Sequence, residues 1–236
     1  MWHFQRRYPG WGTRRLTQEL RPVYPTLTRR VVRHILHTAG RLASAPPRHK
    51  RGRRPIPVGR HRVQMDVQQL PAIQGGTGFA YKIAVIHLRT RLKYAEIHSD
   101  HRTETVAGVL ERARDRLPPF TLVWTDNAPE FTMRDTAHPE RQTAFQRMLA
   151  RLGLQHGTSA PRSPWQNGIV ERSHRTDNAE CFHVLRFTDP EERRYQYRLW
   201  EMAYNTQRPH QGLGGETPWA VYQREYPRHA QCRWPD

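Results

Sequence analysis

Apolar and polar side chains alternate through residues 62–68 of the segment RVQMDVQQL at 62–70. A period of two is typical of a β-strand whose two faces meet different surroundings. The pattern therefore predicts a strand with one apolar face and one polar face. The two sets that it separates are Val63, Met65 and Val67 on one side, and Gln64, Asp66 and Gln68 on the other.

The segments after this strand predict a sheet flanked by helices. A hairpin is expected about Arg89 and Thr90, and a helix at 101–117 has an inward stripe of Val106, Val109, Leu110 and Leu117. Further elements are predicted as strands at 118–126 and 154–159, and as helices at 139–152 and from about residue 165. Three consecutive strands followed by alternating helices and strands favour an α/β fold with a mixed five-stranded sheet.

Two short helical patterns precede this region. Leu16 and Leu20 are four residues apart in the first, and the second helix is predicted to start at the N-cap Thr28 and to stop at Gly40. The apolar positions expected to face inward from the second are Leu27, Val31, Val32, Ile35 and Leu36. Its other face carries Arg29, Arg30, Arg33, His34 and His37. Such a pair is consistent with a helix-turn-helix that binds DNA, and equally with a solvated basic face.

A last helix is predicted near the end of the chain. Asp189 is the expected N-cap, followed by Pro190 at the first helical position and Glu192 at the third. The spacing of apolar residues predicts that its buried stripe consists of Tyr195, Leu199 and Met202. A turn-rich segment and a short terminal helix follow.

Positive charge is concentrated in the first quarter of the chain. Residues 1–62 hold 16 Lys and Arg residues against the single acid Glu19, so fifteen of the eighteen net positive charges lie there. Of the 39 basic residues 36 are Arg, whose planar guanidinium suits bidentate phosphate contacts. The segment 44–60 is rich in Pro and Arg and is predicted to be a semi-extended linker, and the same basic segment is also suited to lie along a DNA backbone. Its candidate phosphate contacts are Lys50, Arg51, Arg53 and Arg54.

Cysteine and hydropathy patterns exclude several classes of protein. Two cysteines, Cys181 and Cys232, provide neither a disulfide framework nor a four-thiolate zinc site. The longest apolar runs are too short to cross a bilayer. We therefore expect a soluble intracellular protein that does not bind membranes.

Three acidic residues stand in settings that can aim them at one point. Asp66 lies within the first strand, Asp126 ends the strand at 118–126, and Glu171 lies near the start of the helix that follows Pro164. Carboxylates on rigid elements are the ligands that Mg²⁺ prefers, and converging carboxylates repel one another unless a cation is bound. The pattern predicts a metal site. Two other acids compete for this role, and we interpret both Glu130 and Asp177 as partners in local contacts.

The chain resembles a known family in four segments: QMDVQQL, VWTDNAPEF, SPWQNGIVERSHR and YNTQRPHQGLGGETP. In this order they are similar to the integrase-core transposases of bacterial insertion sequences, relatives of retroviral integrases with an RNase H-like fold. The resemblance implies that Asp66, Asp126 and Glu171 are the catalytic triad of a polynucleotidyl transferase. It implies a pair of Mg²⁺ or Mn²⁺ ions, nicking at the transposon ends, and attack of the freed 3′-hydroxyl on target DNA. Ala128 stands where the family usually has Gly.

The resemblance also implies partners and an organisation. The partners are transposon ends, target DNA and further copies of the chain on DNA, in the bacterial cytoplasm at the nucleoid. Four regions are expected: a partial helix-turn-helix-like segment at 1–43, a linker at 44–60, the catalytic core at 61–187 and a helical tail at 188–236. More helix-turn-helix sequence is expected ahead of residue 1. Candidate DNA contacts near the triad are Asn127, Gln166, Asn167, Arg172 and Arg175, with Gly168 beside them.

Two other functions share some of these features. A catalytically decayed transposase would bind DNA without metal-dependent cleavage, and the three intact acids argue against it. An RNase H-like nuclease would use the same metal site but would not join strands, and the basic first quarter favours an enzyme that holds DNA ends together. His174 and Arg175 share the helix face of Glu171, where a phosphate contact and an ion pair with Glu171 are equally expected.

Overall fold

The computed structural model describes residues 11–40, 58–73, 78–132, 141–160 and 163–230. These residues form two compact units. The larger unit contains the described residues of 58–208 and 217–230, and the smaller contains 11–40 with 209–216. The larger unit contains two apolar clusters and the smaller unit one.

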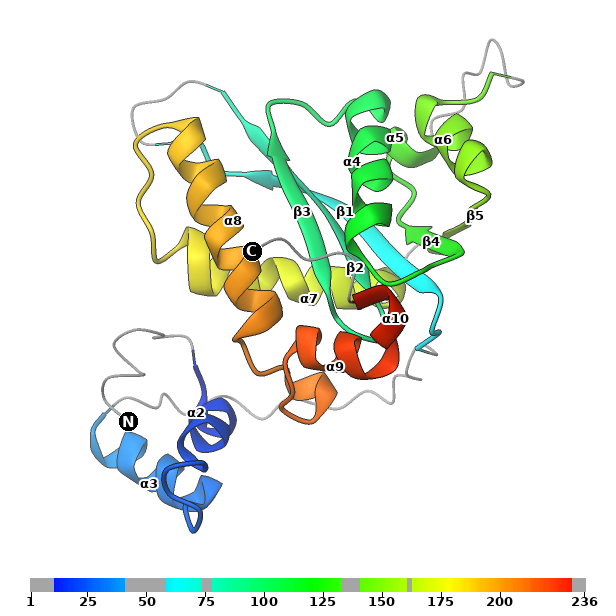
Figure 1. Ribbon diagram of the computed structural model, residues 1–236. Coiled ribbons are helices and arrows are strands. Elements are labelled where there is room, and N and C mark those ends of the chain that lie inside the picture. The colour runs from blue at the N-terminus through cyan, green and yellow to red at the C-terminus, as the bar shows by residue number, and fades with distance from the viewer. Residues whose placement is uncertain (1–10, 41–57, 74–77, 133–140, 161–162, 231–236) are drawn as a thin grey trace. The chain divides into compact units, whose positions relative to one another are not determined.

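The larger unit is organised by one mixed five-stranded sheet (Figure 1). Its strands are β1 (Arg62–Leu70), β2 (Ala80–His87), β3 (Lys93–His98), β4 (Leu122–Thr125) and β5 (Gln155–Thr158). The spatial order is β3-β2-β1-β4-β5. β1 pairs antiparallel with β2 and parallel with β4, so it is the central strand. The mixed sheet predicted from the order of elements is confirmed.

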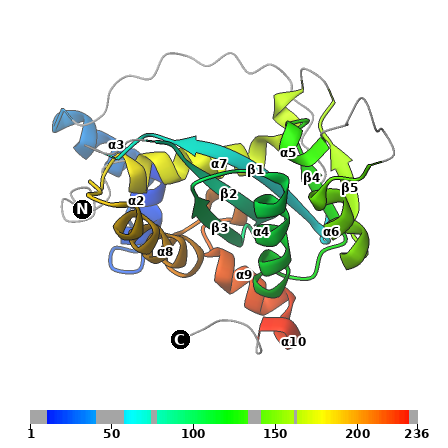
Figure 2. The same cartoon turned by 90° about the horizontal axis from the view of Figure 1, so that it is seen from above.

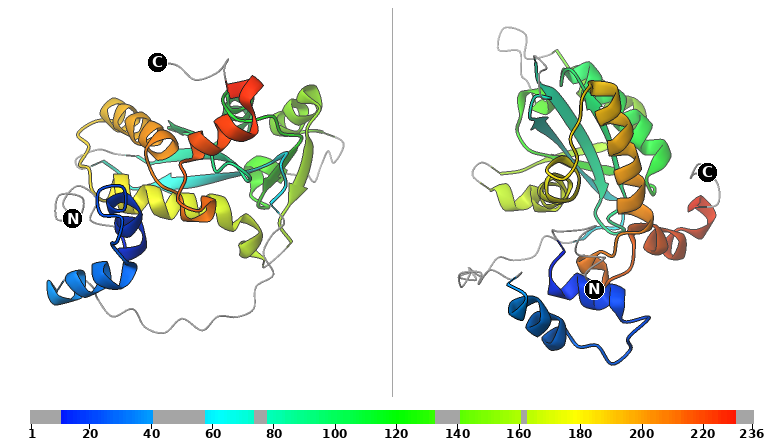
Figure 3. Two further views of the ribbon diagram at one scale, coloured as in Figure 1. Left: turned by 60° about the horizontal axis from the view of Figure 1, so that its bottom comes forward. Right: turned by 90° about the vertical axis from the view of Figure 1, so that its left-hand side faces the viewer.

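Helices cover both faces of this sheet. They are α4 (Thr103–Arg116), α5 (Pro129–Thr132), α6 (Ala144–Leu152), α7 (Gly168–Asp177), α8 (Pro190–Thr206), α9 (Pro218–Glu225) and α10 (Pro227–Ala230). α4 and α6 pack on one face through the larger apolar cluster (Figure 2). α7 lies on the opposite side of the sheet from α4 (Figure 3). α8 lies beside β3 and packs with α7 in the second cluster.

The two faces of β1 separated by the period-two pattern pack against different helices. Val63 and Met65 are fully buried in the cluster beneath α4 and α6, and Val67 packs against it. Gln64, Asp66 and Gln68 each contact α7 or the residue after it, on the other face. The predicted separation of the two sets is confirmed.

Other local predictions are also confirmed. The hairpin turns at Arg89 and Thr90 and includes Arg91, whose φ is +60°. The four residues of the inward stripe predicted for α4 are fully buried: Val106, Val109, Leu110 and Leu117. Asp189 is the N-cap of α8 and accepts hydrogen bonds from the amides of Glu191 and Glu192.

The buried stripe predicted for α8 is wrong. Tyr195, Leu199 and Met202 are exposed to 62%, 40% and 42%. The helix instead turns Tyr197 and Asn205 inward, where Asn205 bonds both backbone groups of Lys93. Besides apolar side chains, the surface that α8 covers presents the backbone of Lys93 and Ala95 and the carboxylate of Asp177, which need polar partners from the helix.

The smaller unit contains α2 (Thr13–Leu20) and α3 (Arg29–Thr38). Leu16, Val32 and Leu36 are buried together with Trp11, and Thr28 caps α3 by accepting a hydrogen bond from the amide of Val31. Leu27 and Ile35 are half-buried, but Val31 is exposed, so the predicted stripe is narrower than expected. All five basic residues of α3 are exposed. Within this unit Arg15 donates to the carbonyl of Pro209.

The described parts of the chain contain no helix that is both long and apolar enough to cross a membrane.

A carboxyl group on α8 makes the stability of the larger unit depend on pH. Burial raises the pKa of Glu201 to about 8 from the 4.5 of an unperturbed carboxyl, while Lys93 acts in the opposite direction. Between these values the folded state keeps a proton that the unfolded chain releases. The stabilising contribution of the protonated group is therefore complete below pH 4.5 and is lost as the pH rises to 8.

We predict that Glu201→Gln, which keeps an oxygen to accept the amide of Ala95, removes this loss. Relative to wild type, the variant should gain roughly 1 kcal/mol or more in unfolding free energy between pH 5.5 and pH 8.5. Denaturant unfolding at the two pH values measures the difference. The matched control is Glu111→Gln on the exposed side of α4, which should shift stability equally at both pH values. Parallel pH profiles for wild type and Glu201→Gln would contradict the prediction.

Candidate active site

The sheet places Asp66 and Asp126 side by side. β1 and β4 run parallel with Gln64 opposite Trp124, and each aspartate comes two residues later on its own strand or just past its end. Asp126 Oδ1 accepts the amide of Ala128 at 3.0 Å, which fixes the carboxylate as the chain leaves β4. Ala128 does not adopt positive φ, so its backbone does not need the glycine of the family pattern.

Glu171 comes from α7, on the face of the sheet that carries Asp66. A short 3₁₀ turn at Pro164–Asn167 leads directly into α7, and Glu171 lies in the first turn of the helix. The partial positive charge of a helix N-terminus favours a carboxylate there. Arg175, one turn further along, has its Nη2 4.0 Å from Glu171 Oε2, and its side chain is largely exposed.

The three carboxylates act on one another electrostatically. Burial is the largest influence on Asp126 and Glu171, and it raises the pKa of both. The charge of Asp66 raises the pKa of each further, and Asp126 adds to the effect on Glu171. β1 and β4 are neighbouring strands, and α7, which carries Glu171, contacts Asp66 through His174. The structure therefore brings the three predicted residues to one region.

His174 contacts Asp66 rather than Glu171. Its Nε2 lies 3.1 Å from Asp66 Oδ2, and the imidazole is almost completely buried. Burial lowers the pKa of His174, and the nearby Lys82 lowers it further. A neutral ring with its proton on Nε2 donates a hydrogen bond to Asp66. The other ring nitrogen, Nδ1, has no hydrogen-bond partner among the described residues. Sequence spacing placed His174 on the face of Glu171 but could not show the strand beneath it.

Two glutamines on either side of Asp66 contact the ends of α7, which was not predicted from the sequence. Gln64 contacts the start of α7, and Gln68 donates to Asn178 Oδ1 just past its end at 2.9 Å. The signal for both was present in the sequence, because they share the polar face of β1 with Asp66. What the sequence lacked was the identity of the helix that this face meets.

The donor chemistry fits a hard divalent cation. Carboxylate oxygens from Asp66, Asp126 and Glu171 are suitable ligands for Mg²⁺ or Mn²⁺. Asn167 Oδ1 and Ser173 Oγ, on the segment that carries Glu171, are buried and have no hydrogen-bond partner within the part of the chain that the structure describes. However, no three His, Cys, Asp or Glu side chains in the described ranges lie close enough to hold one ion. Binding of an ion by all three carboxylates therefore requires side-chain movement.

The predicted DNA contacts near the triad differ in exposure. Arg172 and Arg175 are exposed on α7, and Asn127 is exposed while its Nδ2 donates to the carbonyl of Ser159. Gln166 is half-buried and accepts the amide of Ala160, whereas Asn167 is 3% exposed. In the smaller unit Arg29, Arg30 and Arg33 are exposed. The linker residues Lys50, Arg51, Arg53 and Arg54 lie outside the described residues.

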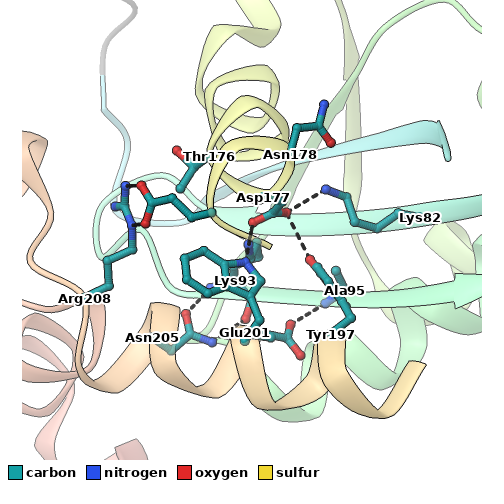
Figure 4. Close-up of polar contacts among 12 residues, drawn as sticks. Lys82, Lys93, Ala95, Thr176, Asp177, Asn178, Tyr197, Glu201, Asn205 and Arg208 are labelled. Atoms are coloured by element: carbon teal, nitrogen blue, oxygen red, sulfur yellow. Dashed lines mark hydrogen bonds and ion pairs between the residues drawn. The ribbon is translucent and has the colours of Figure 1, made fainter. Parts of the chain in front are cut away.

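The two competing acids make the local contacts expected of them. Glu130 lies 3.6 Å from His101 Nδ1. Asp177 is fully buried on the other side of α7 from Glu171, and its oxygens bind the ammonium groups of Lys82 and Lys93 at 2.6 and 2.5 Å (Figure 4). These two lysines hold the pKa of Asp177 well below its usual range, against the effect of burial. Asp177 is thus a structural ion partner.

Comparison with known proteins supports the same family as the sequence motifs. Residues 60–164 and residues 152–218 each match a family described as integrase core domain. A curated relative, an uncharacterized 48.2 kDa protein of insertion element IS2A from Escherichia coli, is 32% identical over 152 residues. The aligned region covers 61% of this chain and 32% of the relative, so the chain spans about a third of that protein.

Solved structures share the fold of the larger unit at low sequence identity. The catalytic core of BIV integrase is 20% identical with a TM-score of 0.52, covering 73% of this chain and 99% of that chain. A chain of the simian T-cell lymphotropic virus intasome is 16% identical with a TM-score of 0.60, covering 93% and 76%. The HTLV-2 integrase catalytic core in complex with magnesium is 14% identical with a TM-score of 0.52, covering 70% and 97%.

These likenesses confirm the RNase H-like fold predicted for the core. The two family matches together extend from residue 60 to residue 218, which includes the sheet, all three carboxylates and α8. The chain therefore belongs to the integrase-core superfamily, which includes the transposases of bacterial insertion sequences.

Proposed function

We propose that this chain is a DNA transposase that nicks the ends of an insertion sequence and joins the freed 3′-hydroxyls to target DNA. The observation that carries the proposal is the placement of Asp66 on β1, of Asp126 just past the end of the adjacent β4, and of Glu171 on α7, which packs on the face of β1 that carries Asp66. A strand, a strand end and a helix start position them, so the carboxylates are held by rigid elements.

In this proposal the three carboxylates hold a pair of Mg²⁺ or Mn²⁺ ions. Such ions would activate the attacking oxygen and neutralise charge on the leaving oxygen of the phosphodiester. The residues of the chain position the carboxylates and contact the DNA. Asp66 and Asp126 are fixed by the sheet, and His174 orients Asp66 through its Nε2 hydrogen bond. The exposed Arg172 and Arg175 are suitably placed on α7 to contact DNA phosphates.

The proposed partners are the insertion-sequence ends, the target DNA and further copies of this chain. The excess of positive charge in the first quarter supports DNA binding there, and the exposed arginines of α3 offer contacts. Assembly of several copies on DNA is suggested by the intasome among the structural relatives. We propose that residues 1–43 bind DNA, residues 44–60 act as a linker, residues 61–187 form the catalytic core, and residues 188–236 form its helical tail. The expected site of action is the bacterial nucleoid.

The first prediction concerns catalysis. Asp66→Asn keeps the shape of the side chain and removes one ligand charge, so strand transfer of an oligonucleotide end should fall by about 1,000-fold or more while DNA affinity stays within about threefold. Glu171→Gln should behave in the same way. Gel assays of nicking and joining with Mg²⁺ or Mn²⁺, together with DNA titration, measure both quantities. Glu111→Gln, an exposed change of the same type, should retain activity.

The possible outcomes separate the proposal from its rivals. Nicking without joining by the wild-type chain would identify a nuclease, and DNA binding without metal-dependent nicking would identify a DNA-binding protein. Undiminished joining by Asp66→Asn would exclude the assignment of Asp66.

The second prediction concerns the basic helix α3. Simultaneous replacement of Arg29, Arg30 and Arg33 by Gln should weaken DNA binding and reduce the slope of log affinity against log salt by about 2 to 3, since each lost phosphate contact removes about 0.9. Fluorescence anisotropy over a range of salt concentrations measures the slope. The control removes three exposed arginines elsewhere, Arg102, Arg147 and Arg198, and should change the slope less. Equal slopes for wild type and the α3 variant would show that these arginines do not contact phosphates.

A further inference from the structure

Gln64 directs its whole amide group at the start of α7. The residue lies on β1 and is 1% exposed. Its Oε1 accepts the backbone amides of Ile169 and Val170 at 3.1 and 3.0 Å, and its Nε2 donates to the carbonyl of Gln166 at 2.6 Å. An oxygen facing two amides and a nitrogen facing a carbonyl is the consistent orientation of the amide. Gln166 lies in the 3₁₀ turn before α7, and Ile169 and Val170 lie in the first turn of α7.

This contact replaces a cap that α7 lacks locally. The first amides of a helix have no partner within the helix, and a preceding side chain usually supplies one. Thr28, Thr143, Asp189 and Thr217 do so for α3, α6, α8 and α9. Asn167 occupies this position before α7, yet its side chain makes no such bond, and no described residue forms a hydrogen bond with its buried Oδ1. Gln64, about a hundred residues away in sequence, caps the helix from the sheet.

The cap lies next to two of the proposed metal ligands. Val170, which Gln64 binds, immediately precedes Glu171, and Asp66 is two residues along the same face of β1. β1 therefore carries the carboxylate of Asp66 and also binds the backbone next to Glu171. Displacement of the first turn of α7 would move Glu171 relative to Asp66 without changing either residue.

We propose that Gln64 is a positioning residue that sets the place of Glu171 relative to Asp66 and thereby the affinity of the site for divalent cations. This inference rests on the proposed metal-dependent function of the three carboxylates. The role proposed for Gln64 differs from that of the contacts at the other end of α7. There Asp177 binds Lys82, Lys93, Tyr197 and Trp200. Those contacts hold the helix to the sheet and to α8, and Asp177 lies six residues beyond Glu171.

The test compares two identical substitutions on the same face of β1. Gln64→Met keeps the length of the side chain and removes all three hydrogen bonds. Gln68→Met makes the same chemical change two residues beyond Asp66, where one hydrogen bond to Asn178 is lost. Both variants are studied as full chains with bound oligonucleotide DNA, below the melting temperature of each. Isothermal titration with Mn²⁺ and the Mg²⁺ dependence of strand transfer give the ion affinity.

We expect Gln64→Met to weaken divalent binding by about tenfold, and to raise the half-saturating Mg²⁺ concentration to a similar extent, as for other residues that support metal ligands. Gln68→Met should change both by less than about twofold. A purely structural role would lower the melting temperature and leave the ion affinity unchanged. Unchanged Mn²⁺ affinity in Gln64→Met, or an equal loss in Gln68→Met, would overturn the proposal.

Amide hydrogen exchange keeps this test independent of the proposed function. Exchange at Ile169 and Val170 should accelerate in Gln64→Met and stay near the wild-type rate in Gln68→Met, whether or not a metal is present. A wild-type chain that binds no divalent ion would refute the proposed function, and accelerated exchange confined to Gln64→Met would still establish the cap. Unchanged exchange at both amides would refute the cap itself.

Discussion

The packing of α7 on the polar face of β1 is the constraint on which the candidate site depends. A strand in the middle of a sheet buries both faces, and polar side chains on one of them must find hydrogen-bond partners there. Gln64, Asp66 and Gln68 find them at the start, the middle and just past the end of α7. Because α7 also carries Glu171, the contacts that satisfy this strand bring the third carboxylate to the other two.

A buried ion cluster holds the far end of the same helix. Asp177, Lys82 and Lys93 are fully buried, and burial works against the charged form of each. The pKa of Lys82 falls to about 8 chiefly through burial, with Asp177 opposing the change. Buried ion pairs add little net stability when complete, but loss of one partner leaves an uncompensated charge. The cluster therefore ties α7 to β2 and β3 in one arrangement, and the three carboxylates of the candidate site, which are only half-buried, lie away from it.

Local patterns predicted the elements well and their partners poorly. Alternation defined β1, and the stripe of α4 was correct, because an aliphatic stripe packs on an aliphatic surface. For α8 the same argument failed, since the surface beneath it offers the backbone of Lys93 and Ala95, which bind Asn205 and Glu201. The three acids could be chosen from their contexts. The roles of His174 and Gln64 could not, because each depends on a contact across more than a hundred residues.

The precision of the site follows from the register of a single strand. Side chains of a strand change faces at every residue, so a slip of β1 by one position would turn Asp66 and Gln64 into the apolar cluster and Val63 and Met65 toward α7. Such a slip is costly for two reasons. It would bury the carboxylate of Asp66 without hydrogen-bond partners, and it would leave the start of α7 without the cap from Gln64. The apolar core beneath α4 therefore fixes the carboxylates on the opposite face. Stability of the fold and geometry of the candidate site are in this respect the same requirement.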